Sequence, residues 1–509
     1  MLHIPFQGLI QQCMETYFSD LHCHSTLFSY NRGYRDTWYE RYVPIFPAQG
    51  NFAQLARGNV RVVMVSLYPI EQGFVTARLL GLGTGAITDL IAKVVVAMPR
   101  RRADEIQDYN HDYFDDLMKE ISFLQASADP VQHRVFTGIL KRKNFRYRIV
   151  SNFNELSSLL NLDDKLNPGP PCDNTIAVVL TIEGAHSLGV GQRNTLEADS
   201  ADLELKLREN IGRLKKAGPP GHEGAWCPFF ITLSHHFWNQ LGGHSVSLWK
   251  AIRKVLDQTP GINHKITGPG MFVIDELLST TNGRRILIDC AHMSISVRRW
   301  YYDYIAQRGT SIPVIVSHTG VNGIATMAEA EMKGEPDDIH DVADELYSNS
   351  ETFNPWDVFL SDQEIIIIHR SGGIIGLNLD QRIMMGHKTL TDIKKRARFK
   401  SAEVARSIWI QPLLKQVLHI ARHIFAVTGQ PAGIWDNISM GSDFNGMITP
   451  IKAFKKAEKF PALYNTMIKE LMQLTATESI LTGKTESEIR EIADKIMWRN
   501  NLEFLKKHF

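Results

Sequence analysis

The chain has 509 residues, of which 44% are hydrophobic, so it can bury one large core. Its net charge of +1 gives no overall attraction to nucleic acid or to an acidic membrane surface. The five cysteines are scattered, which argues against a disulfide framework, and the first residues do not resemble a signal peptide. We therefore expect a cytoplasmic protein. The most apolar helical stretch, residues 86–98, is too short to span a membrane and predicts a buried helix.

Short apolar, β-branched runs predict eight strands, most of them separated by helices. The predicted strands lie near residues 17–22, 60–67, 176–182, 229–234, 286–291, 312–317, 373–379 and 437–442. The clearest helical patterns lie at Asp202–Ala217, Leu248–Leu256, Val297–Arg308 and Ala402–Val427. Eight strands that alternate with helices predict an α/β fold, a (β/α)8 barrel of the TIM type.

Two connections are much longer than the others. Residues 69–175 and 380–436 show helical periodicity, so both are predicted to be helical insertions. Residues 450–509 predict two helices that pack on the barrel. Because no boundary of a second domain is apparent, residues 1–509 are predicted to form a single barrel domain.

The first predicted strand ends in His22-Cys23-His24. Residues i and i+2 of a strand share a face, so both imidazoles can point at the same ion. The pair alone is a weak signal, because surface or core histidines also occur at this spacing. Its weight comes from similar residues at the ends of later strands, since all strands of a parallel barrel end at one rim.

Glu183 follows the third apolar run, where a carboxylate is costly to bury without a partner. It could cap the next helix, pair with an arginine, or bridge two cations with its two oxygens. His186 is expected to brace the loop. After the fourth run, one of His235 and His236 is expected to face the barrel mouth and to polarise a substrate carbonyl, while the other faces away; ordinary loop packing is the alternative for either one.

His292 and His318 end two successive runs in the similar contexts Cys-Ala-His and Val-Ser-His. A single histidine in such a place is usually a satisfied polar group, but two of them could hold a second ion. Asp443 follows the last run in Gly-Ser-Asp-Phe-Asn-Gly. It could form an Asx turn or a helix cap, or it could act as the general base and acid beside a metal-bound water.

Other motifs carry less information. The basic runs Lys141–Arg148 and Lys394–Lys400 are predicted to be solvated helix faces and not nucleic-acid sites. The sequence contains no Walker loop, dinucleotide-binding glycine motif or nucleophile elbow. Cys23 and Cys290 are expected to be small apolar fillers.

Several of these segments resemble the membrane (renal-type) dipeptidases of the amidohydrolase superfamily. Residues 182–189, Ile-Glu-Gly-Ala-His-Ser-Leu-Gly, resemble the Glu-Gly-Gly-His-Ser-Leu segment of that family. Leu233–His235, Leu287–His292, Val316–His318 and Gly441–Gly446 match further family segments in the same order. The resemblance runs from the first predicted strand to the last.

The resemblance implies a distorted barrel with a binuclear zinc site. His22, His24 and Glu183 would surround one divalent ion, and Glu183, His292 and His318 the other. Asp443 would be the catalytic acid and base, and His235 would contact the substrate. Members of that family commonly dimerise, so a homodimer is among the expectations.

The sequence departs from the family in two places. The family usually has His-x-Asp on the first strand, where this chain has His22 and His24. The family also has an arginine shortly after its last metal histidine, which binds the substrate carboxylate, whereas residues 319–333 contain none. Arg382, after the seventh strand, is the candidate replacement for substrate binding.

These observations predict a metal-dependent hydrolase that cleaves an amide bond of a dipeptide or a related small molecule with a metal-bridged hydroxide. One alternative is an amidohydrolase that acts on a lactone, a phosphoester or a non-peptide amide, which the missing arginine favours. The other is a catalytically inactive metal-binding protein. The ligand set and Asp443 argue against that alternative, because a structural zinc site normally has four protein ligands.

Overall fold

A computed structural model describes residues 16–38, 48–75, 98–137, 141–167, 169, 174–196, 200–253, 255–308 and 312–509. Except for Met98, the helix predicted at 86–98 lies outside these residues. Within the described ranges, no helix is long and apolar enough to cross a membrane.

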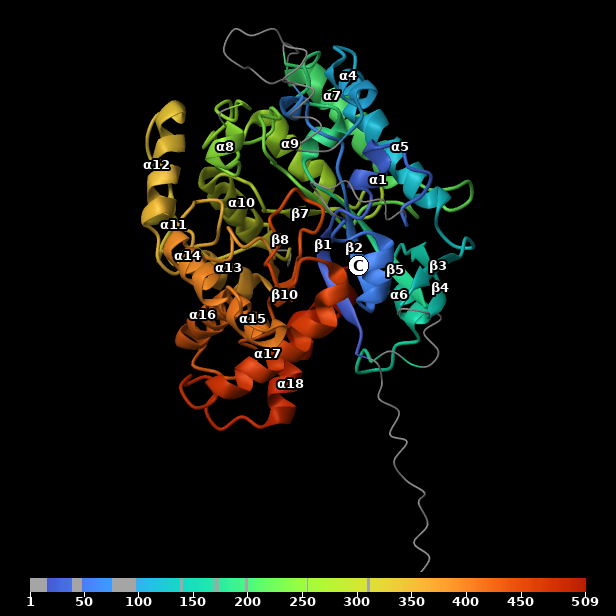
Figure 1. Cartoon of the computed structure of the whole chain (residues 1–509). Coiled ribbons are helices and arrows are strands. Elements are labelled where there is room, and N and C mark those ends of the chain that lie inside the picture. The colour runs from blue at the N-terminus through green and yellow to red at the C-terminus, as the bar shows by residue number, and fades with distance from the viewer. Residues whose placement is uncertain are drawn as a thin grey trace, which may run out of the picture.

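A parallel barrel forms the centre of the molecule (Figure 1). Its strands are β1 (Phe18–Cys23), β2 (Val60–Leu67), β5 (Thr175–Ile182), β6 (Phe230–Thr232), β7 (Leu287–Asp289), β8 (Ile315–Thr319), β9 (Ile374–Leu377) and β10 (Ile438–Met440). They pair in that order, and each pair is parallel. The predicted (β/α)8 fold and the positions of its eight strands are confirmed.

Backbone hydrogen bonds bring the last strand back to the first. The amide of Asp443 donates to the carbonyl of His22, and the amide of His24 donates to the carbonyl of Phe444, both at 3.0 Å. Glycines at 376 and 441 allow β8, β9 and β10 to approach, because a Cβ at either position would lie within 2 Å of the Ser317 carbonyl oxygen. Closure therefore places Asp443 at the same rim as His22 and His24.

Helices surround the barrel (Figure 1). Before β6 they are α1 (Leu27–Asn31), α2 (Phe52–Arg57), α4 (Arg100–Gln107), α5 (Tyr113–Ala126), α6 (Phe153–Leu160) and α7 (Ser200–Lys215), with 3-10 turns η1 (Gln72–Phe74) and η3 (Ala185–Leu188). Between β6 and β10 they are α8 (Lys250–Arg253), α9 (Gly268–Leu278), α10 (Ile295–Gln307), α11 (Met327–Ala330), α12 (Pro336–Asn349), α13 (Asp362–Ser371), α14 (His387–Arg396), α15 (Ala402–Trp409) and α16 (Gln411–Thr428).

The first long insertion is less helical than predicted. Besides α4, α5 and α6 it contains β3 (His133–Phe136) and β4 (Arg142–Ile149), which pair with each other antiparallel, and β4 also pairs with β5 in parallel. The prediction that Lys141–Arg148 is a helix face is therefore wrong. Phe145 and Tyr147 are buried while Arg148 is exposed, so the aromatic residues follow the period-two pattern of a strand.

The second insertion is helical, as predicted, and its basic run lies partly on α14. The helix predicted at Ala402–Val427 is two helices, because α15 ends at Trp409 and Pro412 lies in the first turn of α16. The helix predicted at Leu248–Leu256 is confined to α8, and the amides of Ser247 and Leu248 are bound by the Gln258 side chain instead.

The C-terminal segment contains more helix than the two elements predicted. It has the 3-10 turn η4 (Ala457–Lys459), α17 (Phe460–Leu474), α18 (Glu486–Asp494), the π-helical turn η5 (Lys495–Arg499) and α19 (Asn500–His508). The carbonyl of Trp498 accepts a hydrogen bond from Ser19 of β1, which joins this segment to the barrel wall.

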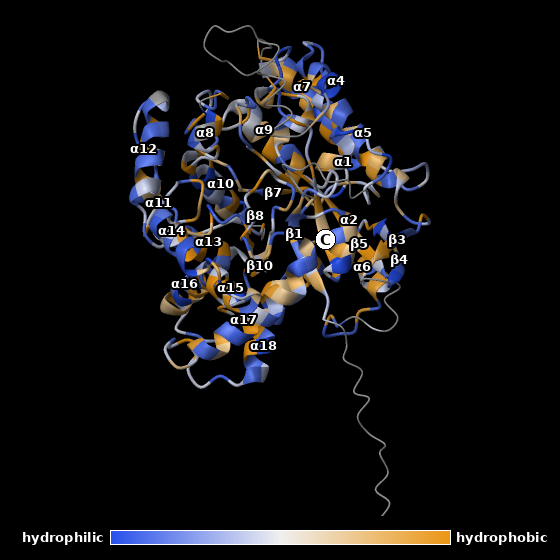
Figure 2. Cartoon of the chain, in the orientation of Figure 1, coloured by the Kyte–Doolittle hydropathy of each residue, from blue (hydrophilic) through white to orange (hydrophobic). Residues whose placement is uncertain are grey.

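The main core lies between the barrel strands and the surrounding helices. In Figure 2 the central strands are largely apolar, whereas α12 at the periphery is mostly hydrophilic. All side chains of β2 and β5 are buried, as expected for parallel strands covered on both faces. This packing fixes the positions of the strand ends, where the polar residues of the rim lie.

A buried ion pair fastens the region between β7 and β9. Arg298 of α10 lies 2.9 Å from Glu364 of α13, and both side chains are almost completely buried. The Arg298 guanidinium also donates to the carbonyls of Asp357 and Val358. It thereby connects two helices to the segment that precedes α13.

We expect Arg298→Met to lower the free energy of unfolding by about 3–5 kcal/mol, because Glu364 would be left buried without its partner charge. Arg396→Met is the matched control: Arg396 pairs with Asp392 at an exposed site, where loss of a pair costs about 1 kcal/mol or less. Urea denaturation followed by circular dichroism measures both changes. Equal effects of the two variants would show that the buried pair has no special role.

Candidate metal centre

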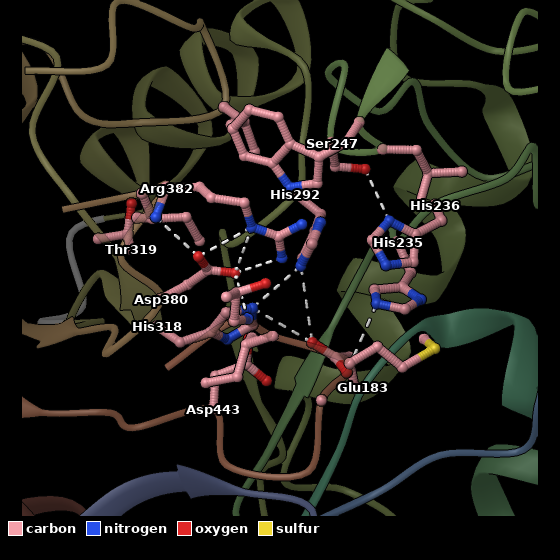
Figure 3. A pocket seen from close by; sticks show the side chains of 18 of the residues that line it. Glu183, His235, His236, Ser247, His292, His318, Thr319, Asp380, Arg382 and Asp443 are labelled. Atoms are coloured by element: carbon pink, nitrogen blue, oxygen red, sulfur yellow. Dashed lines mark hydrogen bonds and ion pairs between the residues drawn. The ribbon is translucent and has the colours of Figure 1, made fainter. Parts of the chain in front are cut away.

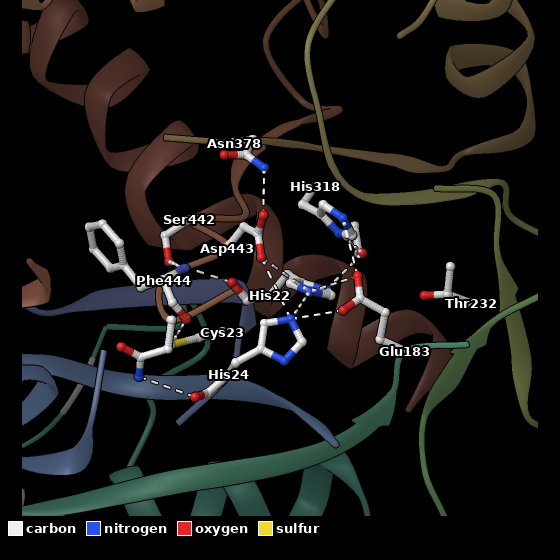
Figure 4. A network of polar contacts seen from close by, with 12 residues as sticks. His22, Cys23, His24, Glu183, Thr232, His318, Asn378, Ser442, Asp443 and Phe444 are labelled. Atoms are coloured by element: carbon white, nitrogen blue, oxygen red, sulfur yellow. Dashed lines mark hydrogen bonds and ion pairs between the residues drawn. The ribbon is translucent and has the colours of Figure 1, made fainter. Parts of the chain in front are cut away.

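Polar side chains at the ends of several barrel strands meet at the carboxyl-terminal rim. Those predicted as metal ligands lie in β1 or directly after it, after β5, after β7 and in β8: His22, His24, Glu183, His292 and His318. All are buried or nearly so. Figure 4 shows His22, His24 and His318 turned toward the Glu183 carboxylate, with Asp443 beside them.

Glu183 has a pair of histidines on each side. Its Oε2 lies 2.9 Å from Nε2 of His24, and its Oε1 lies 3.5 Å from Nε2 of His22. The same Oε1 lies 3.3 Å from Nε2 of His318 and 3.6 Å from Nε2 of His292. Within the pairs, the Nε2 atoms are 3.2 Å apart for His22 and His24 and 3.0 Å apart for His292 and His318.

Ser317 and Asp289 determine which ring nitrogen of two histidines carries the proton. Asp289 accepts hydrogen bonds from Thr232, from the amides of Ala291 and Ser317, and from the Ser317 hydroxyl at 2.6 Å. Because that hydroxyl has one proton, its oxygen must accept from Nδ1 of His22 and from Nδ1 of His318, both at 3.0 Å. Their Nε2 atoms then present lone pairs to Glu183.

This arrangement fits a divalent cation. The Nε2 lone pairs of His22 and His318 and the Glu183 carboxylate repel one another at these distances unless a positive charge lies among them. Burial lowers the pKa of His292 and of His318 to about 3, which favours the neutral rings that bind metals. Among the groups of side chains that could hold a metal ion are His22 with His24 and Glu183, and Glu183 with His292 and His318.

Asp443 lies beside the first pair. Its Oδ1 is 3.6 Å from Nε2 of His24 and 3.9 Å from Nε2 of His22, while its Oδ2 accepts a hydrogen bond from the Asn378 side chain at 3.0 Å. The residue has a positive φ of 57° within the turn that Asn445 continues. Burial raises the pKa of Asp443 well above its ordinary value, against the opposing effect of His24, so this carboxyl is suited to holding a proton.

His235 is held from behind by a second carboxylate. Its Nδ1 lies 2.7 Å from Glu71, which also accepts from the Tyr68 hydroxyl and from the amide of Phe237. Its Nε2 lies 3.5 Å from Glu183. Burial alone would lower the pKa of His235, but Glu183 and Glu71 outweigh it and raise the pKa. His235 can therefore present an N–H group to the metal centre.

One of the two neighbouring histidines was predicted to face away from the barrel mouth. This prediction is wrong, because His236 does not face away. Both His235 and His236 line the same cavity, and Nδ1 of His236 lies 2.6 Å from the Ser247 hydroxyl (Figure 3). The strand ends at Thr232, so the alternation of faces in a strand does not extend to these residues. His186, in contrast, braces its loop as predicted, with Nε2 2.8 Å from the carbonyl of Pro69.

Arg382 lines the cavity as well, but it is engaged by a neighbour. Its Nε lies 3.0 Å from both carboxylate oxygens of Asp380, and its Nη2 pairs with the same group (Figure 3). Asp380 also accepts from the amides of Arg382 and Thr449. The candidate carboxylate-binding arginine is thus already paired with a carboxylate.

A cavity of about 250 Å³ opens above Glu183, with His235, His292, His318 and Asp443 on its lining. The sequence reasoning did not identify the supporting residues Glu71, Ser317, Asp289 and Asn378. For two of them a signal exists: Asp289 ends a strand three residues before His292, and Ser317 directly precedes His318. Nothing local in the sequence points to Glu71.

No protein-family model matches the sequence, and no curated protein matches it. Solved structures do match. The crystal structure of the dipeptidase AC, a metallo peptidase of family M19, has a TM-score of 0.52 and 14% identity over 97% of this chain and 98% of that one. A metallo peptidase from Rhodobacter sphaeroides, liganded with a phosphinate mimic of the dipeptide L-Ala-D-Ala, has a TM-score of 0.50 and 13% identity over 97% and 99%. At these identities the likeness shows a shared fold over the full length.

We expect Ser317→Ala to weaken metal binding by about 10–100-fold, because Nδ1 of His22 and of His318 would lose the oxygen that orients them. Competition with a chromogenic chelator measures the affinity. Ser122→Ala, on an exposed face of α5, is the control. Unchanged affinity in Ser317→Ala would mean that this hydroxyl does not organise the centre.

Proposed function

We propose that this chain is a metal-dependent hydrolase that cleaves an amide bond of a dipeptide or a related small molecule. The observation that supports it most is the position of Glu183 between two pairs of imidazole nitrogens, at the floor of an open cavity and beside Asp443. A site that only stabilises the fold would have no use for a cavity above the ligands or for a carboxyl group that can carry a proton.

His22, His24 and Glu183 would hold one divalent ion, and Glu183, His292 and His318 a second, with zinc expected from the sequence resemblance. When bound, such ions polarise a carbonyl oxygen and lower the pKa of water, so that a nucleophile forms near neutral pH. Glu183 suits a shared position because its Oε1 lies within 3.6 Å of histidines of both groups, while its Oε2 contacts His24. The burial of the ligands keeps bulk water away from these charges.

Asp443 would accept the proton of the attacking water at Oδ1, the oxygen that faces His22 and His24. Asn378 holds the other oxygen and thereby fixes the direction of the carboxyl group. The proton would then pass to the amine that leaves when the amide bond breaks. Burial raises the pKa of Asp443, which favours its holding the proton between the two transfers.

His235 would donate from Nε2 to the carbonyl oxygen as negative charge develops on it. Glu71 supports this role: it accepts at Nδ1 of the same ring and stabilises the protonated form. Tyr68 and the amide of Phe237 keep Glu71 in place. His235 would therefore offer a positively charged N–H donor in a fixed position and would not bind a cation itself.

Asp443→Asn is expected to lower kcat by about 10²–10⁴-fold, because the amide cannot accept and return the proton. Metal content, measured by mass spectrometry, should stay the same, since the metal ligands are unchanged. Asp392→Asn, at an exposed carboxylate of α14, is the matched control. Normal turnover by the Asp443→Asn variant would refute the role assigned to this residue.

The activity itself is tested with a panel of dipeptides, some with C-terminal D-residues, and with their amides. Zinc-loaded protein should hydrolyse at least one substrate, protein stripped by a chelator should be inactive, and added zinc should restore the rate. A folded, metal-loaded protein that hydrolyses none of them would favour an amidohydrolase for lactones or phosphoesters. Tightly held metal that no exogenous ligand can reach would favour a binding protein.

A further inference from the structure

The cavity above the metal centre has two apolar walls. One belongs to a small hydrophobic cluster that contains Phe74 and Leu248, with Met447 packed against it. The other belongs to a cluster that contains Trp356 and Phe359, with Trp249 packed against it. Both clusters are separate from the barrel core. The side chains that form these walls therefore belong to segments outside the barrel core.

An ion pair without net charge, Arg382 with Asp380, also lines the cavity. Arg382 and Asp380 share two contacts at 3.0 Å, and the guanidinium carbon lies 4.8 Å from the centre of the Trp249 ring. Asp380 is 1% exposed and Arg382 only 25%. The Asp380 carboxylate is further held by two backbone amides, so it is built into the wall.

Among the described residues that line this cavity, Arg382 is the one lysine or arginine. Because Asp380 already cancels its charge, a substrate carboxylate placed against this pair would lose its water without gaining an unpaired guanidinium. Burying an uncompensated charge is far more costly than burying a neutral polar group, which can still accept a hydrogen bond from the guanidinium. The apolar walls add to this preference through burial of aromatic or aliphatic groups.

We propose that the substrate of this site carries an apolar side chain and a neutral polar end, such as a carboxamide, where a dipeptide has its free carboxylate. The inference rests on the proposed amide hydrolysis and narrows its substrate class. Trp249, whose ring stacks on the buried Trp356 with centres 4.5 Å apart, would contact the apolar group. The Arg382–Asp380 pair would face the neutral end.

The test compares Leu-Phe with Leu-Phe amide on the zinc-loaded protein. The two differ at one end only, and cleavage of the same bond releases phenylalanine or its amide. We expect kcat/KM to be at least about 10-fold higher for the amide. We also expect Leu-Phe amide to exceed Leu-Gly amide by a similar factor, because glycine leaves the apolar walls unfilled. Equal or faster cleavage of the free dipeptide would overturn the proposal and leave the proposed hydrolase function intact.

Asp380→Asn probes the ion pair directly. Removal of the carboxylate frees the charge of Arg382, so the ratio of kcat/KM for Leu-Phe to that for its amide should rise by about 10-fold. Asp392→Asn breaks an exposed arginine–aspartate pair on α14 and should leave the ratio unchanged. An unchanged ratio in a folded Asp380→Asn variant, as judged by circular dichroism, would contradict the role of the pair.

A binding measurement separates this inference from the proposed function and serves if Asp380→Asn does not fold. Quenching of tryptophan fluorescence reports on both peptides in the zinc-loaded Asp443→Asn variant, and Trp249→Phe identifies the part of the signal that comes from the cavity. Tighter binding of the amide by about 10-fold or more would support the substrate class even if neither peptide is hydrolysed. Equal binding, or tighter binding of the free dipeptide, would overturn it.

Discussion

The structure of the rim depends on the convergence of neutral imidazole nitrogens on one buried carboxylate. Four Nε2 atoms lie within 3.6 Å of the Glu183 oxygens, and those of His22 and His318 present lone pairs to this carboxylate. Such a cluster is repulsive by itself and attractive around cations. The hydrogen bonds from the ring Nδ1 atoms of His22 and His318 to Ser317, and from Ser317 to Asp289, hold two of the rings in this unfavourable arrangement.

The barrel supplies the rigidity that this arrangement requires. Ser317 can contact both His22 and His318 only because β8 and β1 approach each other across the barrel, and Gly376 and Gly441 leave room for the Ser317 carbonyl. On the other side of β1, Asp20 accepts hydrogen bonds from the amide and the hydroxyl of Ser442. A buried aspartate paired with a serine thus fixes the strand ends on both sides of His22.

The sequence predicts the barrel and the residues that converge because both depend on local patterns. Apolar runs mark the strands, and each candidate ligand stands directly at the end of a run, where a parallel barrel collects side chains. The Lys141–Arg148 prediction failed because its many charges concealed the alternation of Phe145 and Tyr147. The orientation of His236 was predicted wrongly because the strand ends earlier than its apolar run.

Contacts between distant segments leave no local pattern in the sequence. Glu71 reaches His235 across 164 positions, and the sequence around Glu71 gives no sign of a partner. The contact between Arg382 and Asp380 is different, since the two residues stand two positions apart in the sequence. This spacing allows the two side chains to form an ion pair. Only the fold shows that both line a cavity, where Asp380 would cancel the charge that Arg382 offers to a ligand.

Reactivity and selectivity therefore come from different parts of the chain. The candidate reactive groups lie on strand ends or directly after them, and the backbone ladder of the barrel fixes their positions. The cavity walls come from connecting segments, among them residues 247–252, 356–359 and 446–449. Leu248, Trp356 and Phe359 of these segments belong to apolar clusters outside the barrel core. Loops on a fixed scaffold can change without disturbing the chemistry of the rim. A change of substrate in this architecture thus requires changes in those segments, and the neutral pair of Arg382 and Asp380 is one place where a single charge decides the outcome.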